Sequence, residues 1–103
     1  MSDELVLREP SGAISLPAAT LDRIVVRAAE RVEGVRVRRP RRSVEVALAR
    51  DEARVSVGLA ARYGIALPEL VAGVQEQVRE ALETMCGVEV RAVDVAVEEL
   101  LEP

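Results

Sequence analysis

The feature that most constrains this fold is residues 63–90, which have the pattern of a strand end, a long amphipathic helix and the start of another strand. Apolar residues recur at the three- and four-residue spacing that places them on one helical face. They are Leu70, Val71, Val74, Val78, Ala81, Leu82 and Met85, and glutamates occupy the opposite face. Pro68 suits the first helical turn, and Gly87 suits the left-handed residue that follows the last turn. We expect this helix to lie on a sheet.

A shorter helix is predicted to begin near Pro17. Its inner face consists of Leu21, Ile24, Val25, Ala28 and Val32. Val26 lies about 140° from Leu21, at about 100° per residue, so we expect it to point outward and to offer a contact to another molecule. Gly34 is expected to end this helix, as Gly87 ends the later one.

Short strands are predicted before the long helix. Residues 35–38 form the first, and residues 44–48 and 55–61 alternate apolar and polar side chains, as the strands of a half-buried hairpin do. Residues 39–43 are predicted to be a loop, because Pro40 interrupts both a helix and a strand ladder.

A last strand is predicted from Val88 onward. Its apolar phase shifts between Val90 and Val93, and a bulge near Arg91–Ala92 would explain the shift, because an extra residue re-aims every later side chain. The fold class predicted is α+β with two layers, in which a mostly antiparallel sheet of three or four strands carries two helices on one face.

The length of 103 residues predicts a single domain with a modest core. We expect residues 1–10 to be a flexible arm, in which Leu5 and Leu7 could instead pair as a short edge strand. Residues 11–98 are expected to form the domain and residues 99–103 an acidic tail.

The first residues lack the pattern of a signal peptide, and no apolar run is long enough to cross a membrane. The single cysteine excludes an internal disulfide, which is typical of a reducing compartment.

The residues that catalysis and metal binding use most are absent or poorly placed. The chain has no histidine, so it can form no Ser-His or Cys-His pair and no histidine metal site. Cys86 lies at the C-terminal end of the long helix, whereas low-pKa thiols favour helix N-termini, so we assign it to packing. Glu98 and Glu99 are adjacent where the expected tail begins, and we expect them to lie outside any cleft. We predict no enzyme, no catalytic residue, no cofactor and no metal site.

Positive charge is concentrated in residues 36–42, which hold five of the fourteen basic residues of a chain with a net charge of −4. The candidate interaction residues are therefore Arg36, Arg38, Arg39, Arg41 and Arg42, together with Val26. We favour pairing of these arginines with acidic groups of a protein. Those groups could belong to the same chain, to another copy or to a different protein partner. The arginines could also meet anionic lipid or nucleic-acid phosphates. The chain has no Phe or Trp on which bases could stack, so nucleic acid is the weaker alternative.

Five stretches, taken in order, resemble the alkaline shock protein family, the envelope stress response proteins of bacteria. They are residues 12–16, 28–35, 63–70, 74–78 and 83–97, which include GAISL, AAERVEGV, YGIALPEL, VQEQV and ETMCGVEV. The resemblance covers the chain from about residue 12 to residue 98. It departs from the family in the Arg-Pro-rich loop and in the short tail.

The resemblance implies a non-enzymatic protein at the cytoplasmic face of the Gram-positive envelope. Proteins of this family self-associate and reach the membrane through an integral-membrane partner, so a homo-oligomer and a membrane anchor protein are the expected partners. No catalytic residue is carried over. Our hypothesis is a cytoplasmic, membrane-peripheral scaffold of the envelope stress response. The alternative is a small nucleic-acid-binding module that uses the arginines of residues 36–42.

Overall fold

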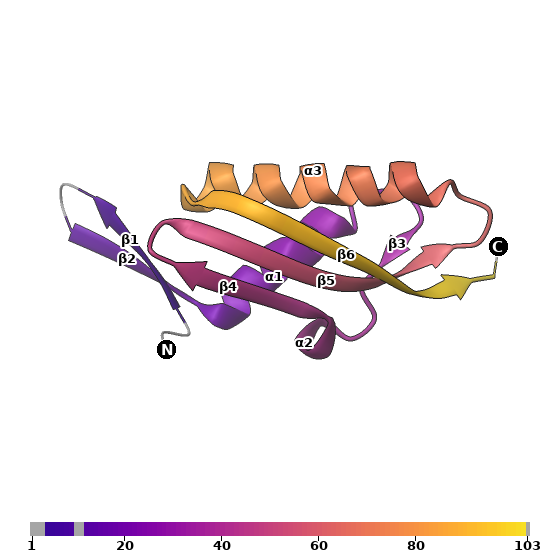
Figure 1. The fold of residues 1–103 in the computed structure, drawn as a ribbon. Coiled ribbons are helices and arrows are strands. Elements are labelled where there is room, and N and C mark those ends of the chain that lie inside the picture. Colours follow the sequence, from indigo (N-terminus) through magenta and orange to yellow (C-terminus); the bar gives the residue numbers. More distant parts are fainter. Residues whose placement is uncertain (1–3, 10–11, 103) are drawn as a thin grey trace.

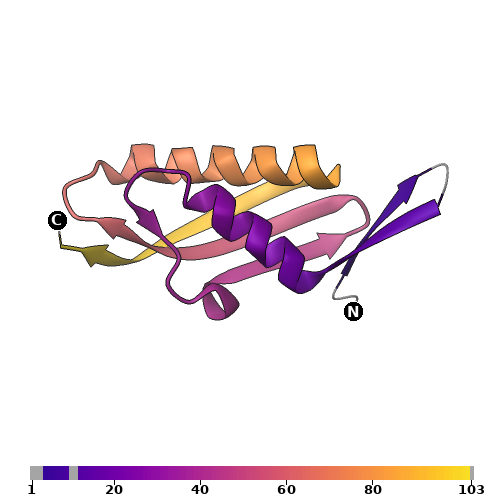
Figure 2. The same cartoon turned by 180° about the vertical axis from the view of Figure 1, so that it is seen from behind.

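Six strands and three helices make up the part of the chain that the computed structural model describes, residues 4–9 and 12–102. In chain order they are β1 (Glu4–Glu9), β2 (Gly12–Pro17), α1 (Ala18–Ala29), β3 (Val35–Arg36), α2 (Pro40–Ser43), β4 (Val44–Ala49), β5 (Glu52–Arg62), α3 (Leu67–Cys86) and β6 (Glu89–Leu101). Helices α1 and α3 contact each other and cover the same face of the main sheet (Figures 1 and 2). The predicted α+β class, with two helices on one face of the sheet, is confirmed.

Strand β5 is the centre of the four-stranded sheet. It pairs in parallel with β6 along its whole length, from Glu52↔Glu89 to Arg62↔Leu101. Strand β6 thus occupies one side of β5. Strands β4 and β3 lie one after the other along the opposite side of β5, and both are antiparallel to it. Two of the three pairings are therefore antiparallel, but the longest is parallel. Parallel neighbours need a long crossover connection, which α3 supplies.

The buried face of α3 follows a row of residues spaced by four. Its buried residues are Leu70, Val74, Val78, Leu82 and Cys86, and Val71 and Ala81 are partly buried. Met85 was predicted on this face but is 62 % exposed. Figure 2 shows the reason, because α1 lies near the N-terminal half of α3 and diverges from its C-terminal end. The predicted ends of the helix are confirmed: Pro68 lies in its first turn, and Gly87, with a φ of 67°, caps it.

Cys86 is buried in the core, in agreement with the packing role assigned from the sequence. Burial raises the pKa of its thiol, because an apolar environment disfavours the thiolate. Since the thiolate is the nucleophile, we expect iodoacetamide to modify Cys86 much more slowly in the folded protein than in the urea-unfolded chain at the same pH. Mass spectrometry over time measures both rates. Equal rates would contradict the burial of this side chain.

Helix α1 ends earlier than predicted and buries a wider face. Its last residue is Ala29, and Gly34 lies in the turn that follows, with a φ of 87°. Its buried residues are Leu21, Val25, Ala28 and Ala29. Val26 is half-buried and packs against the core, so the prediction that it points outward is wrong. The helix contacts both α3 and β4, and a helix with two neighbours buries more than the face turned to the sheet.

The predicted loop at residues 39–43 contains one helical turn, α2. The backbone N–H groups of Arg42 and Ser43 both donate to the carbonyl oxygen of Arg39, at 2.9 and 2.8 Å. Pro40 is the first residue of this turn. The N–H groups of the first helical residues make no hydrogen bond within the helix, so the missing N–H of proline costs nothing there. A proline breaks a helix from within but suits its start, so the prediction of an irregular loop is wrong here.

Strand β6 carries two more residues than its partner over their common length. One extra residue is Arg91, which confirms the bulge predicted near Arg91–Ala92. The other is Glu98, where no bulge was predicted. The strand then continues to Leu101, so residues 99–101, expected in the tail, belong to the sheet.

Strands β1 and β2 form a hairpin that projects from one end of the body (Figure 1). Leu5 pairs with Leu16 and is buried against the core. Part of the expected arm, residues 1–10, is thus a strand. This is the alternative prediction, in which Leu5 and Leu7 belong to a short edge strand. Residues 10 and 11 lie outside the described residues. With the hairpin, the molecule measures 50 by 22 by 17 Å.

Candidate functional site

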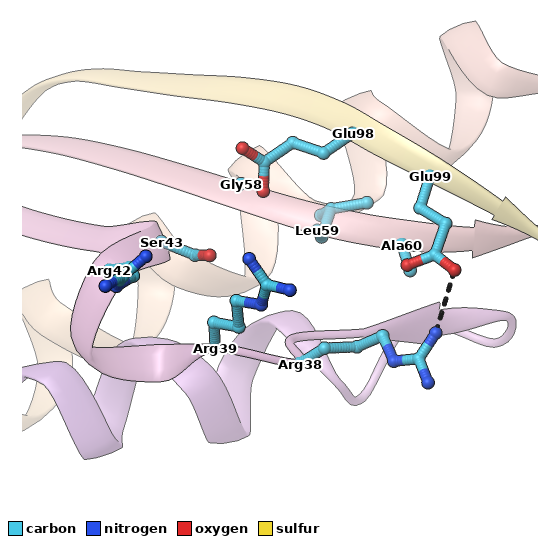
Figure 3. Close-up of a pocket in the computed structure, with 9 residues that line it drawn as sticks. All are labelled: Arg38, Arg39, Arg42, Ser43, Gly58, Leu59, Ala60, Glu98 and Glu99. Atoms are coloured by element: carbon cyan, nitrogen blue, oxygen red, sulfur yellow. Dashed lines mark hydrogen bonds and ion pairs between the residues drawn. The ribbon is translucent and has the colours of Figure 1, made fainter.

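A polar hollow of about 690 Å³ lies on the face of the sheet that α1 and α3 leave uncovered, here called the open face (Figure 3). Its floor is the stretch of β5 from Gly58 to Ala60. The segment from Arg38 to Ser43 borders one side, and Glu98 and Glu99 of β6 border the other. The hollow therefore joins segments that lie far apart in the sequence.

The floor of the hollow is low because β5 carries small residues on its open face. Side chains alternate along a strand, so Val57, Leu59 and Ala61 pack in the core while Gly58 and Ala60 face the other way. Ala60 is nevertheless only 3 % exposed, since longer side chains from both borders reach across it. The strand thus provides a surface on which charged side chains can lie.

The second bulge of β6 brings two neighbouring carboxylates to this one face. In a regular strand, consecutive side chains point to opposite faces, but an extra residue breaks that alternation. Glu98 is the extra residue, and its carboxylate lies over Gly58. A Cβ atom built on Gly58 would lie 2.6 Å from Cδ of Glu98, so a larger residue there would displace the carboxylate from this position.

Arg38 and Glu99 close one end of the hollow with an ion pair. Nη1 of Arg38 donates to Oε2 of Glu99 at 2.8 Å, across the open face of β5. Both side chains are about half exposed, so the pair contributes about 0–1 kcal/mol to stability. The pair links the segment that follows β3 to β6 across β5.

Arg39, Arg42 and Ser43 supply hydrogen-bond donors to the rest of the hollow. Figure 3 shows the guanidinium of Arg39 extending into the hollow below the two glutamates, with the Ser43 hydroxyl on the same side. Among the side chains that the structure describes, no carboxylate forms an ion pair within 4 Å with Arg39 or Arg42. Two guanidinium groups are thus available to a ligand.

The structure brings together three of the arginines singled out from the sequence. Arg38, Arg39 and Arg42 line the hollow, whereas Arg36 lies in β3 outside it. The side chain of Arg41 lies outside the part of the chain whose side chains are described. Val26 belongs to α1 and is absent from the lining.

Sequence reasoning missed the acidic half of the hollow. The interpretation of Glu98 and Glu99 as tail residues outside any cleft is wrong, since both line the hollow. One available signal was the end of the valine alternation at Val97. Two adjacent glutamates followed by Leu100 and Leu101 do not continue a simple two-residue period, which is the pattern a bulge leaves.

Comparison with known proteins gives a match to a family. A model of the alkaline shock protein 23 family, described as having a cell envelope-related function, matches residues 35–101. The match spans β3 to β6 with α2 and α3, so it contains the whole hollow. Neither the curated proteins nor the solved structures gave a match. None of the helices in the described part of the chain combines the length and the apolar character needed to cross a membrane.

Proposed function

This chain belongs to the alkaline shock protein 23 family and has a cell envelope-related function, and on that basis we propose that it is a non-enzymatic scaffold of the envelope stress response. In this proposal it lies at the cytoplasmic face of the membrane, assembles with further copies of itself and binds an integral-membrane partner. The alternative, a nucleic-acid-binding module, has less support because two glutamates stand among the arginines that would meet the phosphates.

The observation that carries the proposal is the opposite charge of the two edges of the sheet. Strand β6 from Asp94 onward and the residue after it are acidic, with Asp94, Glu98, Glu99 and Glu102, whereas β3 and the segment after it hold the five arginines. These elements flank β5 on opposite sides. The acidic edge of one copy can therefore meet the basic edge of the next, and such a head-to-tail contact can propagate.

The backbone of β6 offers a further contact along half of its outer edge. Near its start, side chains of α3 cover that edge: Gln75 donates to the carbonyl oxygen of Val93 at 3.1 Å and Arg79 to that of Val90. Beyond Asp94, no side chain in the described residues makes such a bond. Unpaired N–H and C=O groups on an edge strand are a template for pairing with another chain.

Apolar side chains gather at the same end of the molecule. Tyr63 is 64 % exposed and Leu100 is 50 % exposed, and the N–H of Tyr63 donates to the carbonyl oxygen of Leu101 at 2.8 Å. Leu67, at the start of α3, is also exposed. Surface ion pairs are weak, about 0–1 kcal/mol each, so assembly needs apolar contacts of this kind.

The test combines light scattering with fractionation of native cells. We expect the purified protein to associate as its concentration rises and to dissociate as salt screens its charges. Replacing Arg38, Arg39, Arg41 and Arg42 with glutamine should weaken association and leave the fold intact, because surface substitutions usually change the free energy of unfolding by less than about 0.5 kcal/mol each. The matched control replaces four exposed arginines elsewhere: Arg23, Arg27, Arg31 and Arg54.

Two results would overturn the proposal. One is a protein that stays monomeric at high concentration and low salt and occurs only in the soluble fraction of the cell. The other is equal association of the wild type and the variant without the four loop arginines, together with an unchanged membrane fraction. Retention of the monomer on nucleic acid at low salt would instead favour the alternative.

A further inference from the structure

We propose that the hollow on the open face binds a phosphate group, either free in a small phosphate ester or in the headgroup of an anionic lipid. Arg39, Arg42 and Ser43 are the donors in this site, and Glu98 lies beside the bound group. The inference goes beyond the scaffold function, since it concerns a site within a single copy and does not require assembly.

The three donors are held together by the helical turn α2. The N–H groups of Arg42 and Ser43 both bond to the carbonyl oxygen of Arg39, so the backbone positions of all three residues are fixed relative to one another. A guanidinium presents a planar fork of N–H donors that matches phosphate oxygens, and a serine hydroxyl adds one more donor. This turn thus places two arginines and a serine along one border of the hollow.

The net charge of the groups around the hollow favours the binding of one anion. Three guanidinium groups and two carboxylates line it, so it carries a net positive charge on a chain whose net charge is −4. Glu99 is engaged with Arg38 at 2.8 Å. Arg39 and Glu98 both reach into the hollow, yet no ion pair within 4 Å joins them. The guanidinium of Arg39 is therefore available to an external anion.

The size of the hollow agrees with a small ligand. Its volume of about 690 Å³ is within the range of about 300–1,000 Å³ that small-molecule sites occupy. Glu98 repels a bare phosphate, but its carboxylate can accept a hydrogen bond from a hydroxyl next to the phosphate. A phosphate ester that carries such a hydroxyl, as glycerol phosphate does, fits both halves of the lining.

Phosphorus NMR on the full-length protein tests the site directly. We expect the signals of inorganic phosphate and of glycerol phosphate to broaden and saturate as protein is added at constant ionic strength, with glycerol phosphate bound more tightly. The double variant Arg39→Gln/Arg42→Gln should bind both at least about tenfold more weakly, because it loses charge-assisted hydrogen bonds. Glu98→Gln should bind inorganic phosphate more tightly than the wild type.

The matched control is Arg23→Gln/Arg27→Gln, which removes the same charge from the exposed side of α1. It should bind phosphate as the wild type does, and circular dichroism checks that every variant is folded. Sedimentation with vesicles of phosphatidylglycerol, with phosphatidylcholine vesicles as the control, distinguishes a lipid headgroup from a free phosphate ester. Binding to the free esters alone assigns the site to a small phosphate ester, and binding to the anionic vesicles as well assigns it to a lipid headgroup.

The proposal is overturned if the wild type broadens neither phosphate signal and binds neither kind of vesicle. It is also overturned if the control double variant loses binding as strongly as Arg39→Gln/Arg42→Gln does, since binding would then follow the overall charge. Unchanged binding in a folded Arg39→Gln/Arg42→Gln protein would exclude these residues as the donors.

Discussion

Replacing Leu82 with alanine should lower the free energy of unfolding by about 2–5 kcal/mol. Leu82 is 1 % exposed and is one of the largest fully buried side chains of the core. Removing three of its carbon atoms leaves a cavity that the packed valines of α3 and the sheet cannot fill. A domain of this size has a total stability of about 5–15 kcal/mol, so the loss is a large share of it.

Urea denaturation followed by circular dichroism measures this loss, since the chain has no tryptophan for fluorescence. Met85→Ala is the control on the same helix. Met85 is 62 % exposed, so its replacement should change the free energy of unfolding by less than about 0.5 kcal/mol. If both variants lost the same stability, the buried face of α3 would be assigned wrongly.

Replacing Gly34 with alanine should cost about 1–3 kcal/mol, more than the same change at Gly64. Both glycines have a positive φ, 87° and 96°, which L residues with a Cβ atom rarely adopt, so both variants bear a conformational penalty. Only at Gly34 does the new Cβ atom also meet a side chain, the terminal methyl group of Ile65. At Gly64 no atom lies within 4 Å of it.

A double-mutant cycle separates the two costs. Ile65→Val removes the methyl group that a Cβ at Gly34 would meet, so part of the loss in Gly34→Ala should be recovered in the double variant. The same substitution should recover nothing in Gly64→Ala. Equal losses at both glycines, with no coupling to Ile65, would show that the steric contact has no energetic effect.

Periodicity predicted those parts of the fold that one segment determines by itself. The apolar row through Leu70 and Leu82 identified α3, and the loss of phase after Val90 identified the first bulge. Period alone did not show which strands are neighbours, because a half-buried strand alternates in the same way in parallel and antiparallel sheets. The helix between β5 and β6 was the missed signal, since a crossover of that length makes a parallel pair possible.

The hollow was predictable only in its basic half. The arginines stand close together along the chain, so the sequence alone shows their density. The glutamates opposite them follow about sixty residues later, as the ion pair of Arg38 with Glu99 shows. They reach the open face through the bulge at Glu98, and the carboxylate of Glu98 lies over Gly58; no local pattern links those two positions.

The parallel pairing of β5 with β6 also sets the order in which the chain can fold during synthesis. The hairpin of β4 with β5 is local and can form as soon as both strands have left the ribosome. Strand β6 is the last element described, so the second side of β5 stays unpaired until residues 89–101 have emerged. Until then the apolar row of α3 has only part of the sheet to cover. Such non-local contacts close late and slow folding, so the nascent chain exposes apolar surface for longer than a locally paired sheet of this size would.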